Sequence, residues 1–180
     1  AEAWIAYLEA QASGLPASHE DVAKSYADID SIEALGLLSA GDAYLKSIVT
    51  GLAIGSNTDI SSALAEEDRT FYLEKADNLY AMVVQLDDET PASALLTVSA
   101  LNGRAAIAEA TGDVDRAEGF YINVITRIED QYPALAQQAQ SRINTLVPLA
   151  TETVLPTDAE VSARNAQLVP RETVPENTSI

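Results

Sequence analysis

Apolar and small side chains recur every three or four residues along most of the chain, which is the spacing of one face of an α-helix. No segment of the sequence alternates with the two-residue period of a strand. The pattern therefore predicts an all-α protein whose helices follow one another through short turns. In residue numbers, the predicted helices are about 1–13, 19–27 (or continuing further), 31–54, 66–86, 92–111, 114–131 and 135–147.

The longest predicted helix starts at Ser31 and is ended by a turn-forming segment from Gly55 to Asp59. Gly51-x-x-x-Gly55 matches a close-packing pattern, and we interpret it as helix packing and not as a membrane dimer motif. The inward face of this helix has alternating spacings of four and three, which predicts an amphipathic helix. Its members are Ala34, Leu38, Gly41, Leu45, Ile48 and Leu52.

Residues suited to helix ends separate the later helices. Thr90 and Pro91 fit the cap and first turn of helix 92–111. Gly112 fits its left-handed stop, Asp113 fits the next cap, and Pro148 should terminate the last helix. The inward positions predicted for the last three helices are Leu95, Val98, Leu101, Ala105, Ala108, Ala117, Tyr121, Val124, Ile128, Leu135, Ala139, Ile143 and Leu146.

Residues 150–180 differ in kind from the rest of the chain. They contain three prolines and many Thr, Glu and Val residues, but no aromatic residue and no glycine. Such a segment cannot bury enough apolar surface to fold independently. We therefore divide the chain into a helical domain, 1–149, and an extended C-terminal tail, 150–180. Leu155, Val169 and Val174 are the tail's candidate contact residues.

The segment from Leu101 to Tyr121 resembles a tetratricopeptide repeat (TPR), in which small residues sit where two antiparallel helices approach. Ala105 and Ala108 would be those small residues in the first helix. The turn and the small residue that opens the second helix are matched by Gly112-Asp-x-Asp-x-Ala117. Tyr121 matches a bulky aromatic position of that second helix. The resemblance is clearest over 91–147 and implies antiparallel hairpins stacked as a short TPR-like solenoid.

A seven-residue phrase also recurs, as Glu74-Lys75-Ala76 to Tyr80 and as Asp115-Arg116-Ala117 to Tyr121. The two copies lie 41 residues apart, which exceeds the TPR period of about 34 residues, so an insertion is implied. The segment from Tyr132 to Leu146 is similar to TPR proteins of the bacterial envelope. That likeness favours the periplasmic side of the envelope over the cytoplasm.

The chain carries 28 acidic and 10 basic side chains and a formal charge of −18. This surface repels polyanions, so nucleic acid and anionic membranes are unlikely partners. The acidity is compatible with solubility or a salty habitat, and also with a basic protein partner. No run reaches the roughly 18 apolar residues of a membrane span. The chain starts at Ala1 without methionine, which leaves room for a removed signal or amino-terminal anchor.

Little in the sequence points to catalysis. There is no cysteine, and the single histidine, His19, follows a possible capping box at Ser18 and Asp21, which predicts an exposed first-turn side chain. No nucleophile elbow, phosphate loop or dinucleotide fingerprint occurs. The acidic clusters lack the spacing of a calcium loop and are interpreted as solvated helix ends. We therefore expect no enzyme activity, no cofactor and no metal.

The sequence thus predicts a protein-interaction scaffold or adaptor of TPR-like type. The alternative is a structural accessory subunit of a larger, possibly membrane-associated assembly that docks through its tail. The tyrosines read first as core residues, but Tyr72 lies off the main stripe of its helix and is a candidate contact residue, as are Asn102 and Arg104. Ala106 stands where the family's carboxylate clamp would have asparagine, so that clamp is not expected.

Overall fold

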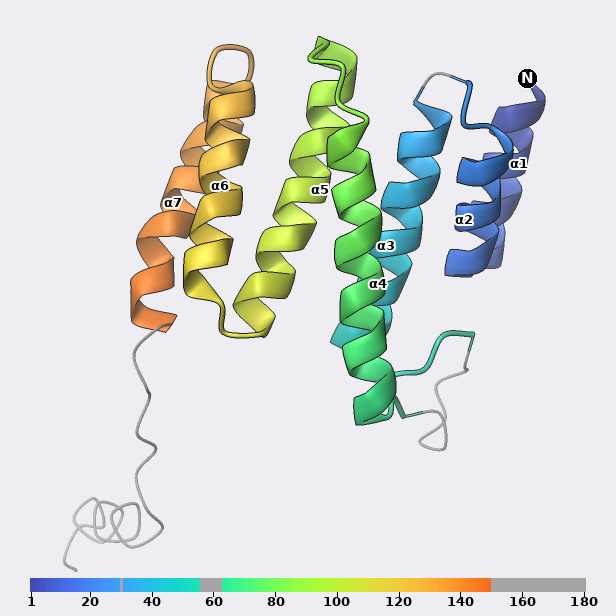
Figure 1. Ribbon diagram of the computed structural model, residues 1–180, viewed down its shortest axis with the longest axis horizontal. Coiled ribbons are helices and arrows are strands. Elements are labelled where there is room, and N and C mark those ends of the chain that lie inside the picture. The colour runs from blue at the N-terminus through green and yellow to red at the C-terminus, as the bar shows by residue number, and fades with distance from the viewer. Residues whose placement is uncertain (30, 56–62, 150–180) are drawn as a thin grey trace, which may run out of the picture. The chain divides into compact units, whose positions relative to one another are not determined.

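A computed structural model describes residues 1–29, 31–55 and 63–149 of the chain (Figure 1). Within these ranges the protein is all-helical, and the only strand-like pairing is an isolated bridge between Leu52 and Ala63. The helices are α1 (Glu2–Ser13), α2 (Pro16–Ser25), α3 (Ile32–Thr50), α4 (Glu66–Gln85), α5 (Pro91–Ala110), α6 (Val114–Ile128) and α7 (Pro133–Leu149). All seven belong to one compact unit, Ala1–Ala150. The predicted tail lies outside the described residues.

Each helix packs against the next one along the chain, from α1 on α2 to α6 on α7 (Figure 1). Two further pairs of odd-numbered helices also touch, α1 with α3 and α3 with α5. The buried side chains form three clusters: one among α1 to α3, one among α2 to α5, and one among α5 to α7. No helix of the described ranges is both long enough and apolar enough for a membrane crossing.

The predicted helix ends at Thr90, Gly112 and Asp113 are confirmed, whereas α7 runs through Pro148, its predicted stop, to Leu149. The Thr90 side chain accepts a hydrogen bond from the Ser93 backbone N–H, and Pro91 is the first residue of α5. Gly112 has a φ of 76°, the left-handed conformation that ends a helix without steric cost only at glycine. The Asp113 side chain accepts from the Arg116 backbone N–H and starts α6. Local chemistry therefore sets these boundaries.

The start of the second helix was predicted wrongly. The helix begins at Pro16, because proline has no N–H to leave unsatisfied in a first turn and its φ is already helical. Ser18 consequently lies inside α2, and the residue before the helix, Leu15, makes no side-chain cap. The earlier start also turns His19 inward, so that it is buried, with 4% of its surface exposed.

The long helix α3 also ends earlier than predicted. Gly51 has a φ of 68° and terminates the helix after Thr50, and Gly55 has a φ of 76°. Their spacing therefore reflects two left-handed turns, and the interpretation of this pair as helix packing is wrong. The glycines that do pack against a neighbour in α3 are Gly36 and Gly41.

Most of the predicted inward positions are buried or half-buried, but Leu95 and Leu135 are exposed. In both helices the buried stripe continues to an alanine beside the leucine, Ala94 in α5 and Ala136 in α7. Those alanines keep the spacing of three or four residues to Val98 and to the later members of the stripe.

Candidate protein-binding groove

The repeated sequence phrase has the same structural role in both copies. Ala76 and Ala117 are fully buried, and the tyrosines four residues later, Tyr80 in α4 and Tyr121 in α6, are also buried. Each tyrosine hydroxyl donates a hydrogen bond of 2.7 Å to a carboxylate of the preceding helix. Tyr80 bonds to Asp42 of α3, and Tyr121 bonds to Glu109 of α5.

Around Tyr80, helices α3 and α5 pack directly against the tyrosine ring. A Cβ atom built on Gly41 of α3 would lie 2.7 Å from the Tyr80 ring, and one built on Gly103 of α5 would lie 2.5 Å from it. Both distances are shorter than real Cβ contacts, so only glycine fits on either side. Burial and the Asp42 hydrogen bond raise the pKa of Tyr80 well above its usual range. We call this contact the Tyr80 seam.

Around Tyr121 the helices stay apart. Within the described residues, no Cα atom of α5 comes within 8 Å of one in α7. The space between them is a groove of about 210 Å³ whose floor is formed by α6. We call it the α5–α7 groove, and its walls and floor are Val98, Asn102, Tyr121, Val124, Leu135, Gln138, Ala139 and Arg142.

The polar groups of the groove are of two kinds. Arg142 pairs with Glu109 through Nη2 and lies 3.5 Å, through Nε, from the Tyr121 hydroxyl, so its guanidinium is held by the protein. Asn102 and Gln138 are exposed, and among the described residues neither side-chain amide has a hydrogen-bond partner. The groove therefore offers two free amides beside an apolar floor.

The predicted contact residue Arg104 has an internal role. Its Nε donates to Asp77 of α4 over 2.9 Å, and Arg116 of α6 donates to the other oxygen of the same carboxylate over 2.6 Å. Both guanidiniums lie over the ring of Phe120, at 4.4 and 5.4 Å from its centroid. Arg104 thus links α4, α5 and α6 and does not line the groove.

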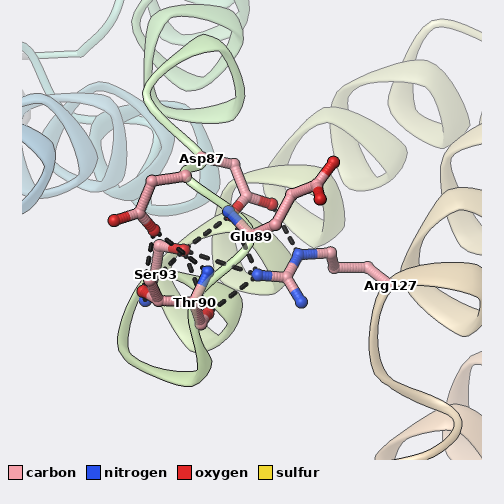
Figure 2. Close-up of polar contacts among 6 residues, drawn as sticks. Asp87, Glu89, Thr90, Ser93 and Arg127 are labelled. Atoms are coloured by element: carbon pink, nitrogen blue, oxygen red, sulfur yellow. Dashed lines mark hydrogen bonds and ion pairs between the residues drawn. The ribbon is translucent and has the colours of Figure 1, made fainter.

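A second charged cluster fixes the turn between α4 and α5 to α6 (Figure 2). Arg127 donates from Nε and Nη2 to the two oxygens of Asp87, over 2.6 and 2.9 Å, and also to the Thr90 carbonyl oxygen. Ser93 donates to Asp87 over 2.6 Å. The hydrogen bond from Arg127 is the main reason that the pKa of Asp87 lies far below its usual range. Within this cluster the charges of Asp87 and Arg127 neutralise each other, and their hydrogen bonds hold the α4–α5 turn against α6.

The remaining predicted contact residues fall elsewhere. Tyr72 is half-buried on α4, with its ring centroid 5.2 Å from that of Tyr44 and 6.0 Å from that of Phe71. Leu155, Val169 and Val174 lie outside the described residues. Of the six predicted contact residues, Asn102 alone lines the groove within the described part of the chain.

Sequence reasoning missed Leu135, Gln138 and Arg142 as wall residues of the groove. The signal was present, because these residues follow one another by three and four positions and so share one face of α7. An apolar residue such as Leu135 fits the buried stripe of α7 equally well, and that interpretation hides the outer face. Tyr121 was assigned to the core, where it does lie, but it also forms part of the floor of the groove.

Buried His19 offers no obvious chemistry. Its Nδ1 has no hydrogen-bond partner among the described residues, and burial lowers its pKa, opposed by a weaker influence of Asp42. In residues 1–29, 31–55 and 63–149, no three His, Asp or Glu side chains come together as a metal site would require. Comparison of the chain with protein families, with curated proteins and with solved structures found no significant match.

Proposed function

We propose that this chain is a non-catalytic protein-interaction module built from TPR-like helical hairpins, and that the α5–α7 groove holds a short segment of its partner. The observation that carries the proposal is that Asn102 of α5 and Gln138 of α7 line the same groove and that neither side-chain amide has a hydrogen-bond partner among the described residues. A polar group that folding leaves unpaired at the mouth of a concave site is available to a ligand.

The arrangement of the helices supports the TPR-like part of the proposal. Consecutive helices pack as neighbours, and contacts between every second helix occur on the odd-numbered side, between α1 and α3 and between α3 and α5. A stack of hairpins that is closer on one side than on the other curves towards the closer side, as solenoid repeats do. The equivalent roles of Tyr80 and Tyr121 add an internal repeat to this order.

The size of the groove limits what it can hold. Its volume of about 210 Å³ is below the roughly 300–1,000 Å³ of sites that enclose a whole small molecule. It suits one or two side chains of a longer peptide. Val98, Val124 and Leu135 would receive an apolar side chain, while the amides of Asn102 and Gln138 can both donate to and accept from a peptide backbone.

The charges of the groove favour an internal peptide segment over a chain terminus. Arg142 is the cation in its lining, and Glu109 already neutralises it. A free terminal carboxylate would meet a guanidinium whose charge Glu109 already neutralises, so it would gain less there than at an unpaired arginine. The presence of Ala106 in place of asparagine likewise predicts that the carboxylate clamp of some TPR proteins is missing here.

The alternative function, an accessory subunit docked through the tail, concerns residues 150–180 and so lies outside the described residues. Location on the periplasmic side of a bacterial envelope likewise stays a prediction that rests on the TPR-like resemblance. Both are compatible with a peptide-binding groove, because neither makes use of α5, α6 or α7.

The proposal can be tested by panning a displayed peptide library against the purified 180-residue chain. We expect enrichment of peptides that share one apolar position, and at least about a tenfold loss of their affinity in the double variant Asn102→Ala/Gln138→Ala, which removes both amides. Affinity is measured by titration calorimetry with a synthetic copy of the enriched peptide.

Gln137→Ala is the matched control. Gln137 is exposed and adjacent to Gln138 on α7, but it does not line the groove, so this variant should bind like the parent chain. If the enriched peptides bind the double variant and the parent chain equally, the groove is not the binding site. If no peptide is enriched, the assignment of a peptide-binding function fails.

A further inference from the structure

Helix α1 exposes its large apolar side chains and buries its small ones. Ala3 and Ala10 face the domain, whereas Trp4, Ile5 and Leu8 are 51%, 57% and 63% exposed. Among the described helices only α2 and α3 pack against α1, and a helix face that no other helix covers is expected to be polar. The outer face of α1 has the composition of a contact surface.

The exposed residues form one continuous stripe. Trp4, Leu8 and Ala12 are spaced by four residues, and Ile5 lies beside them on the same side of the helix. The large side chains of this stripe are separate from the α5–α7 groove, since among the described helices α1 contacts only α2 and α3. We call Trp4, Ile5, Leu8 and Ala12 the α1 stripe.

The charge next to the stripe is of one sign. Glu2 and Glu9 follow each other at a spacing of seven residues along the edge next to Ile5, and α1 contains no Lys or Arg. A second copy of the chain would therefore bring no cation from its own α1, and both copies carry a formal charge of −18. Lipid surfaces with anionic headgroups are disfavoured for the same reason.

We propose that the α1 stripe docks an amphipathic helix of a partner protein whose apolar face is flanked by Lys or Arg. The apolar face covers Trp4, Ile5 and Leu8, and the basic flank lies against Glu2 and Glu9. Such a helix supplies both properties that α1 lacks, an apolar cover and positive charge. The surface is separate from the groove, so this partner need not be the one that binds there.

Trp4 is the only tryptophan of the chain and therefore reports on the stripe directly. The probe is an amphipathic peptide of about 15 residues with a leucine face and lysine flanks, long enough to form a helix on docking. Its analogue carries glutamate in place of every lysine. We expect the lysine peptide to shift Trp4 emission to the blue in a saturable titration, and the glutamate analogue to leave the emission unchanged.

Two variants separate docking from general attraction to an acidic protein. Leu8→Asn keeps the charge of the chain and, because Leu8 is exposed, should leave the fold intact, which circular dichroism verifies. This variant should lower the affinity for the lysine peptide at least about tenfold. Ile122→Asn, at an exposed apolar position on α6, is the control and should not change the affinity. Glu2→Gln/Glu9→Gln should reduce the dependence of the affinity on salt.

Several outcomes would overturn the proposal. Equal binding of both peptides, or of neither, removes the charge argument. Self-association in the ultracentrifuge that Leu8→Asn abolishes would identify a second copy as the occupant, and a blue shift with phosphatidylcholine vesicles would identify a lipid surface. The groove variant Asn102→Ala/Gln138→Ala should bind the lysine peptide normally, so failure of either proposal can be told from failure of the other.

Discussion

The Tyr80 seam and the α5–α7 groove both contain a buried tyrosine paired with a carboxylate, but the helices close over the first tyrosine and leave a groove above the second. In each, a buried tyrosine rises from an even-numbered helix and bonds to a carboxylate of the helix before it. At the seam, Gly41 and Gly103 bring α3 and α5 against the ring from both sides. At the groove, α5 and α7 present Val98, Asn102 and Gln138, and a space remains.

The difference shows that side-chain size on the odd-numbered helices decides whether a tyrosine is covered or left beneath a groove. Where both neighbouring helices have glycine, the helices close over the tyrosine and bury it in the core. Where they have larger side chains, the helices stay apart and the polar ends of those side chains are exposed. The same repeated sequence phrase therefore lies in a closed core in one copy and beneath a groove in the other. Four substitutions or conditions test this comparison, beginning with the largest expected effect.

The first test truncates the two tyrosines. Tyr80→Ala should lower the free energy of unfolding by about 4 kcal/mol, because the cavity it leaves is closed on both sides and stays empty. Tyr121→Ala should cost about 2 kcal/mol, because water can enter from the groove. Urea denaturation followed by circular dichroism measures both values, and equal losses would contradict the distinction between seam and groove.

The second test adds one methyl group to the seam. Gly103→Ala should lower the free energy of unfolding by about 2 kcal/mol, since the new Cβ would meet the Tyr80 ring, which cannot move away from it towards Gly41. Gly119→Ala in α6 is the control. Nothing lies within 4 Å of a Cβ there, so it should stabilise the protein by up to about 1 kcal/mol.

The third test uses pH on the close-packed side, where Gly36 of α3 lies against the backbone of His19 in α2. Burial lowers the pKa of His19 below its usual value of 6.5, so the unfolded chain binds more protons than the folded one as the pH falls. His19 therefore does not affect the free energy of unfolding above about pH 7. As the pH falls below 6.5, its titration lowers that free energy progressively.

The readout for His19 is the urea midpoint at pH 7.5 and at pH 5.5, where His19→Gln should show a smaller decrease than the parent chain. Hydrogen exchange at pH 5.5 should speed up in α2 and α3 before it does so in α6 and α7, after correction for the intrinsic rate. A parent chain and variant with the same pH dependence would show that His19 does not titrate in this range.

The smallest effect is expected in the groove. Asn102→Ala and Gln138→Ala should each change the free energy of unfolding by less than about 0.5 kcal/mol, because both side chains are exposed and make no hydrogen bond within the described protein. A loss above about 1 kcal/mol in either would mean that the amide has a structural partner, and the groove would then lose its free polar groups.

Much of the fold could be read from local chemistry. Thr90, Pro91, Gly112 and Asp113 end or start helices through their own backbone and side-chain preferences, and these boundaries were predicted correctly. Boundaries failed where two signals competed. At Pro16 a proline start overrode the possible capping box that follows it, and in α3 a left-handed Gly51 overrode an uninterrupted apolar stripe.

The candidate site was harder to predict, because it depends on contacts between residues far apart in the sequence. Arg104 resembles an exposed binding residue until its partner Asp77, 27 positions earlier, is placed beside it. Asn102, a predicted contact residue, does line the groove, but Gln138 and Arg142 beside it come from a helix whose distance from α5 no periodicity reveals. Periodicity gives the faces of helices and not the gaps between them.

The Tyr80 seam also has a consequence for motion. A buried tyrosine ring rotates about its axis only when its neighbours move away, and the Tyr80 ring is fully buried, with Gly41 beside its Cδ1–Cε1 edge and Gly103 beside its Cδ2–Cε2 edge. Its two edges should therefore exchange slowly enough to give separate NMR signals for each ring proton, on the microsecond-to-millisecond scale of collective helix motions. The rate of that exchange would report how often α3 and α5 move apart in the folded protein.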